Sequence, residues 1–285
     1  MKASLLDYLH LIKPKLTLMA LATSLSGFYL GSSGPLQFSA LFHVMIGAGL
    51  IGGGANALNQ YLEKDRDAKM SRTKERPLPS LKITENRALF FGLCLSFAGV
   101  VYLYLLANAF SAGLALLTLF SYLLLYTPLK RKTWLNTFVG AVSGALPTLI
   151  GWSAASGQLP TLKAWVLFLI LFIWQLPHFF AIAWVYREDY KNSGFRMLSV
   201  DDTNGRHTSI QIAFYSVLLF AVSLLPAFVG MAGLLYLSAA LFTGLLFLTF
   251  TLYAASHKII YAKQLVTASI FYLAVLNIFL WFDKV

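Results

Sequence analysis

Residues 38–67 read FSALFHVMIGAGLIGGGANALNQYLEKDRD, a long apolar run that ends in a cluster of charges. A helix needs about 20 apolar residues to cross a bilayer, and the uncharged part of this run is long enough. If the helix continues through its charged end, Asn59, Glu63 and Asp67 are four residues apart and share one face. The stretch therefore predicts a spanning helix that carries three oxygen-donor side chains at the membrane boundary.

Similar apolar runs occur throughout the chain. Stretches without Asp, Glu, Lys or Arg, divided where turn signals interrupt them, predict nine spans in all. The expected spans are 16–33, 38–61, 88–106, 110–128, 136–155, 164–186, 208–228, 232–254 and 265–282. The predicted fold class is all-α: a polytopic membrane protein built as a bundle of nine transmembrane helices, with a single domain over residues 1–285.

The composition excludes a water-soluble globular protein. Of the 285 residues, 58% are hydrophobic and 12% are charged, with a mean hydropathy of +0.71, whereas soluble domains carry about 25% charged residues. The net charge of +11 is unevenly distributed. With the N-terminus in the cytoplasm, 20 of the 22 Lys and Arg residues, Lys2 and Lys258 among them, fall inside, and only Lys163 and Lys284 fall outside.

Basic residues are retained on the cytoplasmic side of membrane proteins. We therefore expect the N-terminus inside and the C-terminus outside, in the cell inner (cytoplasmic) membrane. The basic charge is explained by this asymmetry, and no nucleic-acid partner is expected.

Two inside loops, at about 62–87 and 187–206, are long and crowded with charge. They contain nine of the 11 acidic residues of the chain. Loops of this length in a compact protein are typically functional or disordered. The concentration of acids on one side of the membrane favours an active site that faces the cytoplasm.

The three donors on residues 59–67 suit Mg²⁺, which prefers one or two carboxylates together with phosphate oxygens. Basic residues follow at once, and Arg72, Lys74 and Arg76 are suited to grip a diphosphate. The pattern therefore favours a metal-diphosphate site. The alternative is a solvated helix end whose acids pair with neighbouring Lys and Arg.

Polar residues also interrupt the span at 164–186, in the run Trp174-Gln175-Leu176-Pro177-His178. Polar groups are costly at membrane depth and need partners there. Imidazole is a common iron ligand, so His178 is a candidate contact for a polar or metal-containing substrate. The alternative is a packed, hydrogen-bonded histidine beside a helix kink at Pro177.

Residues 59–67, continuing into KMSRTKERPL at 69–78, resemble the first aspartate-rich motif of the UbiA superfamily of intramembrane prenyltransferases. The runs YTPLKR at 126–131, WQLPHF at 174–179 and EDY at 188–190 are similar to the heme-modifying branch of that superfamily. The resemblance implies a nine-helix bundle with a central cavity under the cytoplasmic loops. It also implies a Mg²⁺-dependent reaction in which farnesyl diphosphate and heme B give heme O and diphosphate, with addition of water.

The resemblance assigns roles to particular residues. Metal and diphosphate would be held by Asn59, Glu63, Asp67 and Asp189. The charge of the leaving group would be neutralised by Arg72, Lys74, Arg76, Lys130 and Arg131. Trp174 and His178 would contact the heme or its reacting vinyl group. Membrane lipid is an expected partner, and a heme A synthase or a terminal-oxidase assembly protein is a possible one.

Two positions depart from the superfamily pattern. Glu63 stands where the superfamily more often has Asp, and its longer side chain would shift the metal. Ser193 stands four residues after Asp189, where a second acid would complete the second motif, so the number of Mg²⁺ ions stays open.

Two other functions fit the sequence less well. A prenyltransferase of the same superfamily would act on an aromatic quinone precursor, but the runs at 126–131 and 174–179 argue against that acceptor. A membrane transporter would favour charged residues within several spans, whereas here the acids gather at one membrane face.

Overall fold

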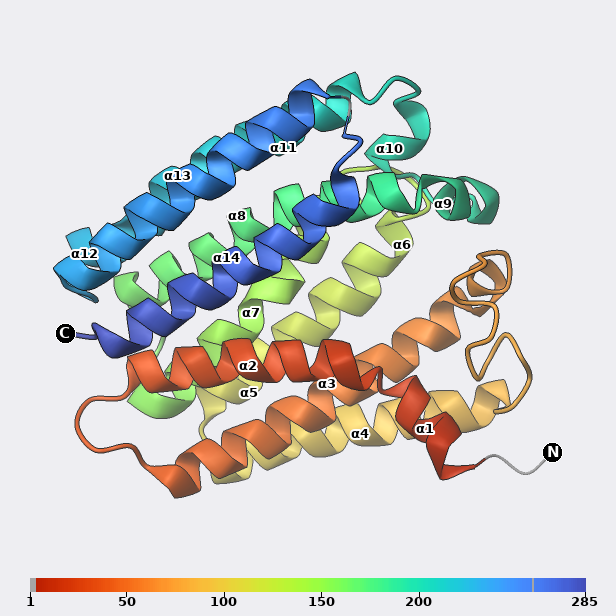
Figure 1. The fold of residues 1–285 in the computed structure, drawn as a ribbon. Helices are drawn as coiled ribbons and strands as arrows, with labels where there is room; N and C mark the ends of the chain where they lie inside the picture. Colours follow the sequence, from red (N-terminus) through yellow and green to blue (C-terminus); the bar gives the residue numbers. More distant parts are fainter. Residues whose placement is uncertain (1–3, 258) are drawn as a thin grey trace. The chain divides into compact units, whose positions relative to one another are not determined.

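The computed structural model describes residues 4–257 and 259–285, so Lys2 and Lys258 of the charge count lie outside the described residues. The chain is helical (Figure 1). Its elements are α1 (Leu5–Leu11), α2 (Pro14–Gly31), α3 (Phe38–Asp67), α4 (Glu85–Leu106), α5 (Ala109–Leu119), the π-helix η1 (Phe120–Tyr126), α6 (Thr127–Leu129), α7 (Asn136–Ser156), α8 (Leu162–Val185), α9 (Arg187–Ser193), α10 (Leu198–Asp201), α11 (Arg206–Ser223), α12 (Leu225–Phe228), α13 (Leu234–Ser256) and α14 (Ala262–Phe282).

Eight helical segments in the described residues are long and apolar enough to cross a membrane. They are 38–67, 85–106, 109–129, 136–156, 162–185, 206–228, 234–256 and 262–282. Each overlaps a predicted span, and all but the helix at 38–67, which was predicted to end at 61, match its bounds within a few residues. The all-α polytopic fold is therefore confirmed. The remaining predicted span, 16–33, is also a helix, α2, but Lys15 and several Ser and Thr side chains make it less apolar. The nine-span count and the orientation therefore stay predictions.

The chain divides into two compact units. The first unit comprises residues 1–159 and 189–195, and the second unit comprises residues 160–188 and 196–285. Within the first unit α3 packs along α4, and α2 packs along α7 (Figure 1). Within the second unit α11 packs against α8 and α13, and α14 packs against α13 and α8.

Glycines let α2 and α7 approach closely. A Cβ atom added at Gly151 would lie 1.8 Å from the carbonyl oxygen of Ser24, and one added at Gly27 would lie 2.0 Å from that of Thr148. Small residues at helix interfaces in membrane proteins allow such contacts between backbones. The separation of α2 and α7 is therefore set by residues that have no side chain.

Replacing Gly151 by Ala is expected to lower the free energy of unfolding by about 1–3 kcal/mol, because the new methyl group overpacks the α2–α7 interface. Chemical unfolding of the purified protein in detergent measures the change. Gly113→Ala is the matched control, since a Cβ atom there meets nothing within 4 Å. Equal effects of the two substitutions would contradict the role given to the close contact.

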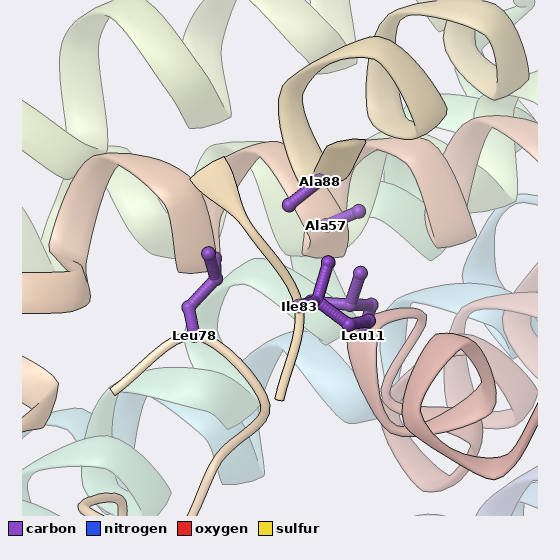
Figure 2. Packing of buried hydrophobic residues seen from close by; sticks show 5 residues of the cluster. All are labelled: Leu11, Ala57, Leu78, Ile83 and Ala88. Carbon is purple, nitrogen blue, oxygen red and sulfur yellow. The ribbon is translucent and has the colours of Figure 1, made fainter. Parts of the chain in front are cut away.

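The segment between α3 and α4 is folded back onto the helices. Its apolar side chains join a buried cluster made of Leu11, Ala57, Leu78, Ile83 and Ala88 (Figure 2). The chain reverses around Leu81, whose φ is 57°, and the next two backbone N–H groups both donate to the carbonyl oxygen of Pro77, at 2.9 and 3.2 Å. The loop predicted at 62–87 thus has its own buried contacts, which position its polar residues next to the end of α3.

Candidate active site

Asn59, Glu63 and Asp67 lie on one face of α3, because that helix continues to residue 67 as predicted. All three are buried, with exposed fractions of 1%, 4% and 1%. A carboxylate this deeply buried is costly unless a counter-charge and hydrogen bonds accompany it. The surrounding elements supply both.

Each of the two carboxylates is paired with a basic side chain from a different segment. Lys130 Nζ, at the end of α6, donates to both oxygens of Glu63, at 2.9 and 3.1 Å. Arg76, from the loop after α3, donates to Asp67 Oδ2 at 2.7 Å. Burial alone would lower the pKa of Lys130, but the attraction of Glu63 raises it well above its usual value. The ion pairs expected of a solvated helix end are therefore present, but the two carboxylates that form them are buried.

The third donor is bound by Lys13, a residue that the sequence did not single out. Lys13 Nζ donates to Asn59 Oδ1 at 2.8 Å. Its backbone has a left-handed φ of 47°, which in a residue with a side chain costs about 1–3 kcal/mol. Pro14 follows, and a residue before proline is disfavoured from the helical region. Burial lowers the pKa of Lys13 to about 7, and the nearby charge of Arg76 adds to this shift.

The π-helix η1 and the short helix α6 that follows it bring aromatic and hydroxyl groups to the same cluster. Thr127 Oγ1 accepts a hydrogen bond from Asn59 Nδ2 at 3.2 Å and donates one to the carbonyl oxygen of Tyr122 at 2.8 Å. Tyr122 and Tyr126 stack with ring centres 5.6 Å apart, and Lys130 Nζ lies 4.4 Å from the centre of the Tyr126 ring. Such an aromatic face stabilises a buried ammonium. Short π-helices are frequent at functional sites.

Residues 189–195 of the second predicted loop belong to the first unit and dock onto it. Asp189 accepts hydrogen bonds from the backbone N–H of Ser71 at 3.1 Å and from its hydroxyl at 2.8 Å. Burial alone would raise the pKa of Asp189, but these hydrogen bonds hold it below its usual value. Arg66 Nη1 donates to the carbonyl oxygens of Ser193 and Gly194, at 2.7 and 2.8 Å.

Gly194 is required at this junction. Its φ is +70°, and an added Cβ atom would lie 3.1 Å from Arg66 Nη1. The next residue, Phe195, is buried and lies 5.6 Å from Lys130 Nζ and 5.3 Å from the Arg66 guanidinium, measured to the ring centre. The segment that carries Asp189 is therefore joined to the buried cluster through these two cations.

The five basic residues predicted to bind diphosphate are placed differently. Lys130 and Arg76 form the ion pairs with the two buried carboxylates. Arg131 is exposed and donates to the carbonyl oxygen of residue 62 at 2.7 Å. Arg72 is exposed, and its charge acts on the carboxylate of residue 189. Lys74 is exposed. Within residues 4–257 and 259–285 it takes no part in the side-chain hydrogen bonds and ion pairs of this site.

The donor set fits Mg²⁺ bound together with an anion. Asp67 Oδ1 is buried and has no hydrogen-bond partner among the described residues, and a buried carboxylate oxygen needs a partner such as a cation. In the part of the chain that the structure describes, no three His, Cys, Asp or Glu side chains converge to hold an ion by themselves. This is consistent with the preference of Mg²⁺ for one or two carboxylates plus phosphate oxygens.

Trp174 and His178 lie in the second unit, on α8, and both are bound by one residue of α14. Their rings stack with centres 4.9 Å apart and an interplanar angle of 20°. Trp174 Nε1 donates to the carbonyl oxygen of Ser269 at 2.7 Å, and His178 Nδ1 lies 2.7 Å from Ser269 Oγ. Ser269 was not predicted, because a serine within an apolar span carries no signal of its partner.

The fold and the site together define a class of protein. Its members are all-α membrane proteins in which carboxylates and basic side chains gather at one end of a spanning helix, an arrangement suited to a metal-bound diphosphate. The model of the UbiA prenyltransferase family matches residues 20–282, and the chain belongs to this family. The resemblance predicted from the motifs is thereby confirmed.

Curated relatives match over nearly the whole chain. The protoheme IX farnesyltransferase of Solibacter usitatus is 46% identical over 98% of both chains. That of Aquifex aeolicus is 40% identical over 95% of this chain and 92% of its own.

Solved structures share the fold at low identity. One, described as digeranylgeranylglyceryl phosphate synthase, has a TM-score of 0.82 at 19% identity and covers 98% of both chains. A UbiA homolog from Archaeoglobus fulgidus bound to DMAPP and Mg²⁺ has a TM-score of 0.65 at 13% identity, covering 96% of this chain and 99% of its own.

Proposed function

We propose that this chain is a protoheme IX farnesyltransferase. It transfers the farnesyl group of farnesyl diphosphate to a vinyl group of heme B, with addition of water, and gives heme O and diphosphate. The observation that carries this proposal is the 46% identity to a protoheme IX farnesyltransferase over 98% of both chains. The buried cluster of the first unit supplies the chemistry that such a reaction requires.

The first step is loss of diphosphate, and the buried cluster is where it takes place. Asn59, Glu63, Asp67 and Asp189 would hold Mg²⁺, which when bound supplies positive charge to the leaving group. Support comes from the unpartnered oxygen of Asp67 and from the UbiA homolog that binds Mg²⁺ with DMAPP.

The basic residues of the site act on the same developing charge. Lys13, Arg76 and Lys130 are held in place by their partners on α3, so these side chains are preorganised before substrate arrives. As the bond between the allylic carbon and oxygen breaks, its electron pair leaves with diphosphate, and preorganised cations stabilise that charge. Arg72, Lys74 and Arg131 are proposed to bind the diphosphate from the exposed side.

The second step forms the new carbon–carbon bond. The π electrons of the heme vinyl group attack the allylic cation, and the cation that results on the heme side chain takes up water and releases a proton. Bulk water must be excluded from the allylic carbon until that attack is complete. Trp174 and His178 are proposed to contact the heme.

The proposal includes a topology. Nine helices, α2 among them, would cross the inner membrane with the N-terminus inside, so that the acidic loops face the cytoplasm. The distribution of Lys and Arg supports this orientation. A heme A synthase or a terminal-oxidase assembly protein would be the partner that receives the product.

Purified protein in liposomes, supplied with heme B, farnesyl diphosphate and Mg²⁺, tests the proposal. We expect heme O, identified by its mass, and we expect its formation to fall to background when a chelator removes Mg²⁺. The same assay with an aromatic quinone precursor in place of heme B is the acceptor control. Diphosphate release with that acceptor, and none with heme B, would replace the proposed function by the aromatic one.

A further inference from the structure

The hydroxyl of Ser269 on α14 makes two short contacts within the second unit. Ser269 Oγ lies 2.7 Å from the carbonyl oxygen of Val266 and 2.7 Å from His178 Nδ1. Ser269 is fully buried, and His178 has an exposed fraction of 7%. In this environment bulk water does not replace either hydrogen bond, so both contacts must be satisfied as they stand.

The hydrogen-bond direction at Ser269 favours one tautomer of His178. A carbonyl oxygen only accepts, so the single proton of the Ser269 hydroxyl is donated to Val266. With that proton used, Ser269 Oγ is the acceptor for His178, an arrangement that favours the ring proton on Nδ1. In this tautomer Nε2 is left with a lone pair.

The orientation of the ring is fixed as well. Trp174 stacks on the imidazole, and its indole N–H is bound by the backbone carbonyl of the same Ser269. One residue of α14 thus holds both rings of α8, the indole through its carbonyl group and the imidazole through its hydroxyl group. A neutral imidazole whose second nitrogen is held by a hydrogen bond is the arrangement found at metal-ligating histidines.

We propose that Ser269 is a positioning residue that holds His178 in the Nδ1–H tautomer, so that Nε2 serves as an axial ligand to the iron of the heme substrate. This inference rests on the proposed function, since it takes heme B to be the acceptor. Iron ligation holds the porphyrin at a defined position, which in turn holds the vinyl group. The residue that binds the iron is therefore separate from the residues that bind diphosphate.

Nitrogen-15 NMR of histidine-labelled protein without heme tests the tautomer directly, and it does not depend on any transferase activity. We expect His178, assigned by its loss in His178→Ala, to show a protonated Nδ1 and an unprotonated Nε2. Ser269→Ala should abolish this pattern, and Ser269→Thr, which keeps the hydroxyl, should restore it. A wild-type signal with the proton on Nε2, or an unchanged signal in Ser269→Ala, would overturn the proposal.

Titration with heme B, followed by absorption and electron paramagnetic resonance, tests the ligation. The spectrum of histidine-ligated heme should be lost in His178→Ala and should return on addition of free imidazole. Ser269→Ala should weaken heme binding about 10- to 100-fold, the range found when hydrogen-bond partners of metal ligands are removed, and Ser269→Thr should recover it.

Ser223→Ala is the matched control for the heme titration. Ser223 is also fully buried in the second unit, and its hydroxyl also donates to a carbonyl three residues earlier, at 2.8 Å. We expect its heme affinity to equal that of the wild type. Histidine-type ligation that survives in His178→Ala would overturn the proposal even if heme O is formed, whereas absence of heme O with the expected NMR and heme spectra would count against the proposed function alone.

Discussion

Replacing Asp67 by Asn is expected to reduce the rate of heme O formation by about 10²- to 10³-fold, the scale seen when one preorganised charge-stabilising group is removed. The substitution keeps the shape of a side chain that is only 1% exposed but removes its charge. It also removes the carboxylate oxygen that has no partner among the described residues. The initial rate in liposomes with saturating Mg²⁺ and farnesyl diphosphate is the measurement.

Asp65→Asn is the matched control for this experiment. Asp65 is two residues away on the same helix, but it is exposed, and its substitution should leave the rate within about twofold of the wild type. Thermal unfolding of both variants in detergent establishes that they are folded. An Asp67→Asn enzyme that keeps a tenth of the wild-type rate would refute the role given to this carboxylate.

Replacing Lys130 by Met is expected to lower the free energy of unfolding by about 3–5 kcal/mol, because it leaves the buried carboxylate of Glu63 without its counter-charge. Both oxygens of Glu63 accept from this one ammonium, and no other residue in the described part of the chain forms an ion pair with Glu63. The measurement is chemical unfolding in detergent with chelator present, so that no added cation replaces the lysine.

The double variant Glu63→Gln with Lys130→Met separates stability from activity. Removing both charges should recover most of the lost stability, since replacing a whole buried ion pair is often nearly neutral. Turnover should stay at background, because both the metal ligand and the leaving-group cation are absent. Lys132→Met, at an exposed position on the same loop, should match the wild type in both measurements. A single Lys130→Met variant as stable as the wild type would contradict the importance of the pair.

Much of the architecture was determined by the sequence alone. Apolar length determines a span, and eight spans were therefore predicted, seven of them within a few residues at both ends. The spacing of Asn59, Glu63 and Asp67 determined their common face, because helix geometry is local and repeats every 3.6 residues. The short helix α1 was not predicted, although Ser4 and Asp7 form a capping box, because its seven residues are far fewer than a membrane span needs.

The partners of these residues were decided by tertiary structure. Lys13 and Asn59 are 46 residues apart in the chain, and His178 and Ser269 are 91 apart. Asp189 and Ser71 are 118 apart, and only the family resemblance linked Asp189 to the first motif. A pattern in the sequence repeats over a few residues and indicates which face of a helix is polar. Which distant group pairs with that polar face depends on how the helices pack. A buried charge is stable only when a partner from elsewhere in the chain reaches it.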